Sequence, residues 1–459
     1  SDCVKNTEHS TIIIDGHSFM HATRSNYLNP QTHTDDYPAS YYVATANEDT
    51  QRNYPSLTEA VEADVCVVGG GFSGVNTALE LADRGYKVVL LEGRRIGWGA
   101  SGRNGGQLIR GVGHGLDPFR KALGQEGIDA VTQMGYESVD IIRQRVARFN
   151  IQCDLKWGYC DLALRPRHLK DLDADYEDLK ATGYAHKFER IGKDRMHEVV
   201  GSDRYIGGLV DYGAGHLHPL NLITGEAAAA AELGVQIFEN SLVTEVQYGD
   251  RVRVRTAQGE VRADRLVLCG NAYVAGLNDA LADKVLPAGS YVIATEPLTE
   301  AQAKQVLPQD MAVCDLNVAL DYYRLSADRR LLFGGLCNYS GRDPASIEAA
   351  LKPHMNKVFP YLKHLRIDYQ WGGMIGIGAN RFPQIGRLQP NVYYAQAYSG
   401  HGLNVTHLSG RLIAESIHQE SKRLDIFEKV KHITFPGGPK FRSPILALGM
   451  LYHRLRDVI

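Results

Sequence analysis

The chain has 459 residues, of which 44% are hydrophobic and 22% charged, and its formal net charge is −3. This length allows two or three domains, and the composition is that of an ordinary globular protein with a large core. The near balance of charge argues against a nucleic-acid partner. No apolar run reaches the roughly 18 residues needed to cross a membrane, so no membrane partner is expected.

Residues 1–60 are polar and irregular, but they contain Tyr27, Pro30, Tyr37, Tyr41 and Tyr42. The aromatic residues predict an N-terminal arm that packs on the body of the protein. The first residues show no basic n-region followed by a long apolar stretch, so no signal peptide is expected.

The stretch from Asp64 to Glu92 is the most informative part of the chain. An apolar run at 65–68 predicts a buried strand, Gly69-x-Gly71-x-x-Gly74 follows, then a helical pattern ending at Gly85, and a second apolar run at 88–91. In such a βαβ unit the glycines permit a tight turn, close approach to a pyrophosphate and close helix packing. The helix N-terminus faces the phosphates, and Glu92 can accept hydrogen bonds from a ribose diol.

This fingerprint alone does not choose between FAD and NAD. FAD is favoured because the chain has no second complete GxGxxG and because a glycine-rich, basic run, 94–106, follows at once. A run so rich in glycine is either mobile or moulded against a flat ligand.

The remaining elements alternate between the two expected domains. Helices are predicted at 117–150, 167–181, 227–233 and 344–364, and strands at 155–164, 207–211, 235–238, 242–247, 252–256, 265–268, 291–295, 322–325 and 331–333. The block 369–416 returns to glycine-rich strands and one helix, and an amphipathic stretch lies at 445–455. The expected division is an arm at 1–60, a discontinuous FAD-binding domain at 61–150, 213–285 and 366–425, a substrate domain at 151–212 and 286–365, and a C-terminal tail at 426–459.

The seven cysteines are scattered, without a CxxC pair, and Cys66 and Cys269 fall inside apolar strand patterns. This usage indicates buried thiols in a reducing cytoplasm. His216 and His218 have no clustered acid or cysteine to complete a ligand set, so no metal site is expected.

Five segments together carry a family resemblance: GGGFSGVNTALELADRG, Glu92, WGASGRNGGQ, PQIGR at 383–387 and YSGHGLNVTHLSGRLIAE at 398–415. In this order they resemble the D-amino-acid oxidase family of FAD-dependent oxidoreductases. The resemblance implies an α/β (α+β) fold, with a Rossmann-like FAD-binding domain and a discontinuous β-sheet substrate domain. It also implies tightly bound FAD, with the substrate oxidised on one face of the flavin.

The resemblance assigns cofactor-binding residues position by position. Those expected to contact or shape the FAD site are Gly69, Gly71, Phe72, Ser73, Gly74, Glu92, Gly93, Arg94, Trp98, Ala100, Ser101, Arg103, Asn104, Gly105, Gly106, Gln107, Val243, Gly270, Gly400, His401, Gly402 and Leu403. The loop at 400–403 is expected to place backbone N–H groups at the flavin pyrimidine, which gains negative charge on reduction.

Further segments, including DYYRLS at 321–326 and the tail FPGGPKFRSPILALGMLYHRLRD, are similar to family members that degrade polyamines. This implies oxidation of the terminal amine of a γ-glutamylated polyamine, with O2 as acceptor. An amino acid or N-methyl amino acid as substrate stays open, and so do a non-catalytic FAD protein and the oligomeric state. Candidate pocket residues are His401, Trp371, Tyr322, Tyr323 and Trp98; a substrate carboxylate would need an arginine, with Arg324, Arg342 and Arg381 as candidates.

Two departures from sarcosine oxidases of the family matter. The stretch WGGMIGIG at 371–378 lacks the cysteine that attaches FAD there, so non-covalent FAD is expected. The strand RRLLFGG lacks the lysine that assists O2, so an electron acceptor other than O2 stays open.

Overall fold

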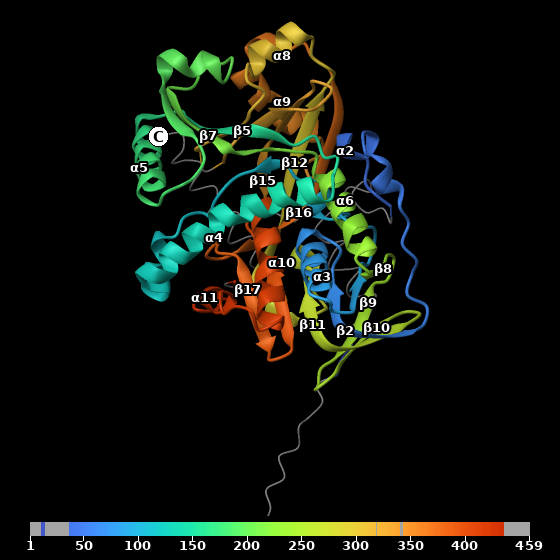
Figure 1. The fold of residues 1–459 in the computed structure, drawn as a ribbon. Helices are drawn as coiled ribbons and strands as arrows, with labels where there is room; N and C mark the ends of the chain where they lie inside the picture. The colour runs from blue at the N-terminus through green and yellow to red at the C-terminus, as the bar shows by residue number, and fades with distance from the viewer. Residues whose placement is uncertain (1–10, 14–35, 318, 340–342, 436–459) are drawn as a thin grey trace, which may run out of the picture.

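The computed structural model describes residues 11–13, 36–317, 319–339 and 343–435, which fold around two sheets. Figure 1 shows one sheet in the lower half of the molecule and the other in the upper half. Because each sheet collects strands from distant parts of the chain, the two are interleaved in sequence and joined in space.

The lower sheet contains the βαβ unit predicted from the glycine fingerprint. Its parallel strands are β18 (Val392–Gln396), β11 (Glu260–Leu268), β2 (Ala60–Val68), β3 (Val88–Leu91) and β8 (Gln236–Phe238). Antiparallel strands extend it: β1 (Thr11–Ile13), β9 (Val243–Gln247), β10 (Val252–Thr256) and β17 (Gln384–Gln389). Val65, Cys66 and Val67 have no exposed surface, as expected for a parallel strand covered on both faces.

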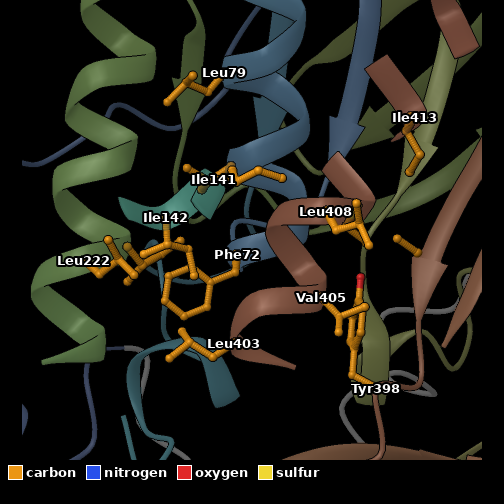
Figure 2. Close-up of a cluster of buried hydrophobic side chains, with 14 of the residues drawn as sticks. Phe72, Leu79, Ile141, Ile142, Leu222, Tyr398, Leu403, Val405, Leu408 and Ile413 are labelled. Atoms are coloured by element: carbon orange, nitrogen blue, oxygen red, sulfur yellow. The ribbon is translucent and has the colours of Figure 1, made fainter. Parts of the chain in front are cut away.

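Four helices pack around this sheet: α3 (Phe72–Asp83), α4 (Arg120–Arg148), α6 (Pro219–Glu232) and α10 (Leu403–Ile417). Figure 2 shows Phe72, Ile141 and Leu222 meeting in their shared core. Helices α3 and α10 approach closely, because a Cβ atom at Gly410 would lie 2.7 Å from the backbone nitrogen of Thr77.

The upper sheet has the order β16 (Ile367–Gly378), β12 (Val285–Thr295), β15 (Leu331–Asn338), β14 (Tyr322–Leu325), β13 (Ala312–Asp315), β5 (Lys156–Ala163), β7 (Gly207–His216) and β4 (Gln107–Leu108), with β6 (Phe188–Gly192) beside β7. Helices α5 (Pro166–Ala181), α8 (Glu300–Val306) and α9 (Ile347–Val358) cover it, and α7 (Asp279–Ala282) and α11 (Leu424–Glu428) lie in connections. Tyr323, Phe333 and Phe359 form a second core, with the first two rings stacked at 5.3 Å.

The α/β architecture predicted from the sequence is confirmed, but some element boundaries differ. Helix α6 begins at Pro219 rather than at Ala227, because the His218 ring accepts a hydrogen bond from the Asn221 N–H and caps the helix. Strand β7 continues past Asp211 to His216, through small residues that fit against β5.

The described part of the predicted arm packs on the body. Helix α2 (Tyr41–Ala44) buries Tyr42 completely, and its ring meets Trp371 edge-on at 5.2 Å. Tyr27, Pro30 and the stretch 445–455 lie outside the described residues.

Candidate active site

The glycine loop after β2 has the shape that its sequence predicts. Gly69 has φ +112°, a left-handed conformation that favours glycine. A Cβ atom at Gly74 would overlap the carbonyl oxygen of Gly69, and one at Gly71 would lie 2.9 Å from the Ser101 hydroxyl. The absence of side chains therefore lets helix α3 start against the end of β2 and keeps the space in front of its N-terminus free.

Glu92, at the end of β3, is fixed beside this loop by the backbone. Its carboxylate accepts hydrogen bonds from the N–H groups of Gly70, at 2.6 Å, and Arg94, at 2.8 Å. Burial raises the pKa of this carboxyl to about 7. A hydroxyl donor from a ribose would stabilise the charged form, which fits the predicted role.

The glycine-rich run after β3 closes over the helix terminus. The Ser101 hydroxyl, in the short 3-10 helix Ala100–Gly102, accepts a hydrogen bond of 2.9 Å from the Phe72 N–H. Arg103 is buried and donates to the Gly372 carbonyl at 3.1 Å, while its Nη2 has no hydrogen-bond partner among the described residues. The guanidinium lies 4.6 Å from the centre of the Trp98 ring. A buried cation with a free donor suits an anionic group such as a pyrophosphate.

The loop before α10 supplies the opposite wall. Ser399 and Gly400 have positive φ angles, and Gly402 precedes the helix without a side-chain cap, which leaves backbone donors at its N-terminus. The Tyr398 hydroxyl joins Ser73 of α3, at 2.6 Å, to Ser409 of α10, at 2.9 Å. His401 has no partner for Nε2 among the described residues, and burial lowers its pKa to about 3.

These segments line one cavity of about 1140 Å³, which continues onto the upper sheet. Such a volume exceeds the roughly 300–1,000 Å³ typical of a drug-sized ligand site, so it has room for a large cofactor and a substrate. All of the predicted cofactor-binding residues line it except Gly74, whose part is the close packing of α3 described above.

The predicted catalytic residues separate into two groups. His401, Tyr322 and Trp98 line the cavity, and Tyr322 packs its ring next to Gly105. Trp371 does not line it: the indole is buried in the main core and donates a 3.0 Å hydrogen bond to the Arg103 carbonyl. The prediction that Trp371 contacts substrate is therefore corrected to a supporting position behind Arg103.

Other candidates prove structural. Tyr323 points into the second core and bonds to the Tyr205 hydroxyl. His216 and His218 lie outside the cavity lining, the first bonded to the Asp310 carbonyl and the second capping α6.

The three arginine candidates also differ. Arg324 is buried, and its guanidinium donates to the carbonyl groups of Gly105, Leu217 and Leu325, so it is not free for a substrate. Arg381 lines the cavity, and Arg342 lies outside the described residues.

Sequence reasoning missed several cavity residues. His114 Nε2 donates a 2.8 Å hydrogen bond to the Ser399 carbonyl, and Arg110 pairs with Asp211 at 2.6 Å. Both lie within eight residues after the glycine-rich, basic run 94–106, and that closeness was the available signal. Asp161 gave no signal, because it is one residue in a strand that becomes part of the cavity only through sheet pairing.

Among the described residues, no group of three or more histidine, cysteine or acidic side chains gathers as it would around a metal ion. In the same part of the chain, every helix is too short or too polar to cross a membrane. Cys66 and Cys269 are free and buried, as predicted.

Residues 64–416 match the family described as DAO, FAD dependent oxidoreductase. The chain belongs to this family. Its cofactor is FAD, as the sequence predicted. It is 42% identical over 423 residues to gamma-glutamylputrescine oxidoreductase from Escherichia coli strain K12, covering 92% of this chain and 99% of that protein.

Two solved structures share the fold. Glycine oxidase from Geobacillus kaustophilus aligns with a TM-score of 0.68 at 20% identity, covering 81% of this chain and 100% of that one. L-proline dehydrogenase from P. horikoshii aligns with a TM-score of 0.66 at 22% identity, covering 81% and 96%. Together with the family match, they confirm the predicted fold class.

The cavity fits FAD in its chemistry as well as its size. The glycine cradle and the N-terminus of α3 suit the pyrophosphate, Glu92 suits a ribose, and Arg103 offers an unpaired donor. The N-terminus of α10 has backbone donors that would suit the flavin ring. Non-covalent attachment stays a prediction.

Proposed function

We propose that this protein oxidises the terminal amine of γ-glutamylputrescine, or of a close γ-glutamylated polyamine, to an aldehyde with release of ammonia. The observation that carries the proposal is the single cavity shared by the predicted FAD segments and the upper sheet. The 42% identity along nearly the whole chain to gamma-glutamylputrescine oxidoreductase supports this substrate class.

When bound, FAD accepts two electrons and a proton from the carbon that carries the amine. The protein has to present that amine in its neutral form, because the nitrogen lone pair stabilises the developing iminium. Tyr322 and Trp98 offer aromatic surface for this, and His401 stays neutral because its pKa is about 3. None of these three side chains offers a negative charge that would hold a proton on the amine, which favours the neutral amine over an ammonium. Water then hydrolyses the imine to the aldehyde and ammonia.

The proposed electron acceptor is O2. Oxidation of the reduced flavin by O2 would give H2O2. Among the described residues that line the cavity there is no lysine, and the resemblance gives a lysine this role in sarcosine oxidases. A dehydrogenase with another acceptor is therefore the alternative for this half-reaction.

A second candidate substrate is an amino acid or N-methyl amino acid. The names of the structural neighbours, glycine oxidase and L-proline dehydrogenase, motivate it. Their identity to this chain is about half that of the E. coli relative, which favours the γ-glutamylated amine.

The test is anaerobic mixing of the purified holoenzyme with γ-glutamylputrescine, followed by air, while the flavin band is recorded. Bleaching with return of colour and H2O2 supports the oxidase, and bleaching without rapid return indicates another acceptor. No bleaching with γ-glutamylputrescine, but bleaching with sarcosine, glycine or a D-amino acid, would replace the proposed substrate. The domain boundaries and a cytoplasmic location stay predictions alongside this proposal.

A further inference from the structure

A row of side chains crosses the upper sheet on the face that lines the cavity. In the strand register, Cys314 of β13 is the partner of both Asp161 on β5 and Tyr322 on β14. All three residues line the cavity, as expected for directly opposed residues, which share a face. Neighbouring strands lie about 4.8 Å apart, so the backbones of Asp161 and Tyr322 are separated by about 10 Å.

Asp161 is a carboxylate with no ion-pair partner among the described residues. Its Oδ1 accepts a 3.0 Å hydrogen bond from the Tyr159 hydroxyl, and no described cation lies within ion-pair distance of either oxygen. Arg110 is near enough to act on its charge, but the guanidinium is engaged by Asp211 at 2.6 Å. Asp161 is only partly exposed, and a carboxylate with reduced access to water and no positive partner is costly. A cation that enters the cavity would supply the missing partner.

The surroundings of Asp161 favour the ammonium, rather than the carboxylate, of an α-amino acid group as the neighbour of its side chain. Asp175 and Asp178 of α5 also line this end of the cavity, and the positive charge of Arg110 is offset by Asp211. These groups make the cavity beyond the upper sheet negative, whereas the predicted FAD end contains Arg94 and Arg103.

The cation at Asp161 is not expected to be the reacting nitrogen. A carboxylate in contact with the reacting amine would hold its proton, whereas oxidation requires the neutral amine. A substrate with two nitrogen centres resolves this conflict, because one can be neutral while the other is charged. The α-ammonium of a γ-glutamyl group is ten bonds from the terminal amine, about 12 Å in an extended chain at backbone-like dimensions. This span is comparable to the roughly 10 Å between the backbones of Asp161 and Tyr322.

We propose that Asp161 binds the distal ammonium of the substrate while the reacting amine lies beside Tyr322. Asp161 is thus a specificity-determining residue that selects an extended amine with a second, charged nitrogen. This inference rests on the proposed function and deepens it.

The kinetic test uses two substrates and the Asp161→Asn holoenzyme. The substrates are γ-glutamylputrescine and N-(4-aminobutyl)glutaramate, which lacks only the α-ammonium, and the readout is anaerobic flavin reduction. A charge-assisted hydrogen bond contributes about 1.5–3 kcal/mol, or roughly 10- to 150-fold in affinity. In the wild type, loss of the α-ammonium should raise the dissociation constant by that factor, with a change of less than about 3-fold in the limiting rate.

Asp161→Asn should bind γ-glutamylputrescine more weakly by the same factor. Its dissociation constants for the two substrates should then be equal. Asp161→Glu, which keeps the carboxylate, should retain most of the affinity. Asp173→Asn is the matched control: it lies on α5, is largely exposed and pairs with Arg190 outside the cavity, so its constants should equal those of the wild type. Equal weakening of both substrates by Asp161→Asn would overturn the inference.

A binding measurement separates this inference from the proposed function. γ-Glutamyl-n-butylamide keeps the α-ammonium but has no terminal amine to oxidise, and its binding is followed by calorimetry with flavin-loaded protein. At least tenfold weaker binding to Asp161→Asn supports the inference even if γ-glutamylputrescine fails to reduce the flavin. The inference would be overturned if the wild type and Asp161→Asn bound the butylamide with equal affinity, or if neither bound it. This holds whether or not γ-glutamylputrescine reduces the flavin.

Discussion

The Ser101 hydroxyl accepts a hydrogen bond of 2.9 Å from the backbone N–H of Phe72, the first residue of α3. Ser101 belongs to the glycine-rich run and Phe72 to the fingerprint, so this bond joins the two segments that the sequence assigns to the cofactor. It also satisfies one of the N–H groups that a helix leaves open at its start.

Ser101→Ala should weaken FAD binding without unfolding the protein. The substitution leaves the Phe72 N–H without its partner and removes a hydroxyl from the cavity wall, at a cost of about 1 kcal/mol or more. We expect the dissociation constant of FAD, measured by flavin fluorescence on reconstitution of the apoprotein, to rise about 5- to 20-fold. Ser101→Thr, which keeps the hydroxyl, should bind FAD more tightly than the alanine variant; equal affinities would contradict this role.

Gly71→Val should give a folded protein without flavin. A Cβ atom at this position already lies 2.9 Å from the Ser101 hydroxyl, and the two methyl groups would occupy the space in front of α3. The flavin-to-protein absorbance ratio after purification should fall to near zero. Gly249→Ala is the control, because its Cβ atom would meet its nearest neighbour at an ordinary 3.4 Å. Full flavin content in Gly71→Val would refute the assignment of this loop.

Glu80→Ala should destabilise the fold strongly. This buried carboxylate of α3 pairs with Arg145 of α4 at 2.5 Å and with Arg411 of α10 at 3.2 Å, so its loss leaves buried positive charge without a partner. The expected cost is about 3–5 kcal/mol in the free energy of unfolding, measured by urea denaturation.

Asp83→Ala is the matched control on the same helix. Asp83 pairs with Arg148, whose side chain is 53% exposed, so its removal should cost at most about 1 kcal/mol. If Glu80→Ala and Asp83→Ala lowered the free energy of unfolding by similar amounts, burial would not determine how much each ion pair contributes to stability.

His218 should make stability depend on pH below neutrality. Burial, with the nearby Arg324 charge, lowers its pKa to about 3 from the usual 6.5. Between these values the unfolded chain binds a proton that the folded protein does not, so stability falls as pH decreases from 6.5 towards 3, by up to about 1.4 kcal/mol per unit.

His218→Asn tests this dependence while keeping an N-cap acceptor for α6. The free energy of unfolding of the variant should fall less steeply than that of the wild type between pH 6.5 and 5. His364→Asn, on the exposed surface, should leave the slope unchanged. Parallel slopes for His218→Asn and the wild type would assign the acid sensitivity to other groups.

The local features of the cofactor site could be predicted because the residues that form them are close together in the sequence and follow a known spacing. The turn at Gly69, the start of α3 and the place of Glu92 all follow from the βαβ spacing. The sequence pattern places the start of α6 at Ala227 rather than at Pro219. The difference arises because the N-cap residue is His218, and histidine is not among the residue types favoured at an N-cap. The role of Trp371 was misjudged because an aromatic residue has the same sequence signature in a core and in a pocket.

The sequence by itself determined the family, the FAD cofactor and most of the segments that surround it, since steric and hydrogen-bonding demands near the pyrophosphate restrict residue types over a few neighbouring positions. Only the tertiary structure decided which polar residues face the substrate end of the cavity. Asp161, Cys314 and Tyr322 come from three strands separated by up to about 160 residues, and only strand pairing aligns them on one face. It likewise decided that Arg324 is engaged by backbone carbonyls and that no described cation lies within ion-pair distance of Asp161, because ion pairs depend on packing rather than on sequence neighbours.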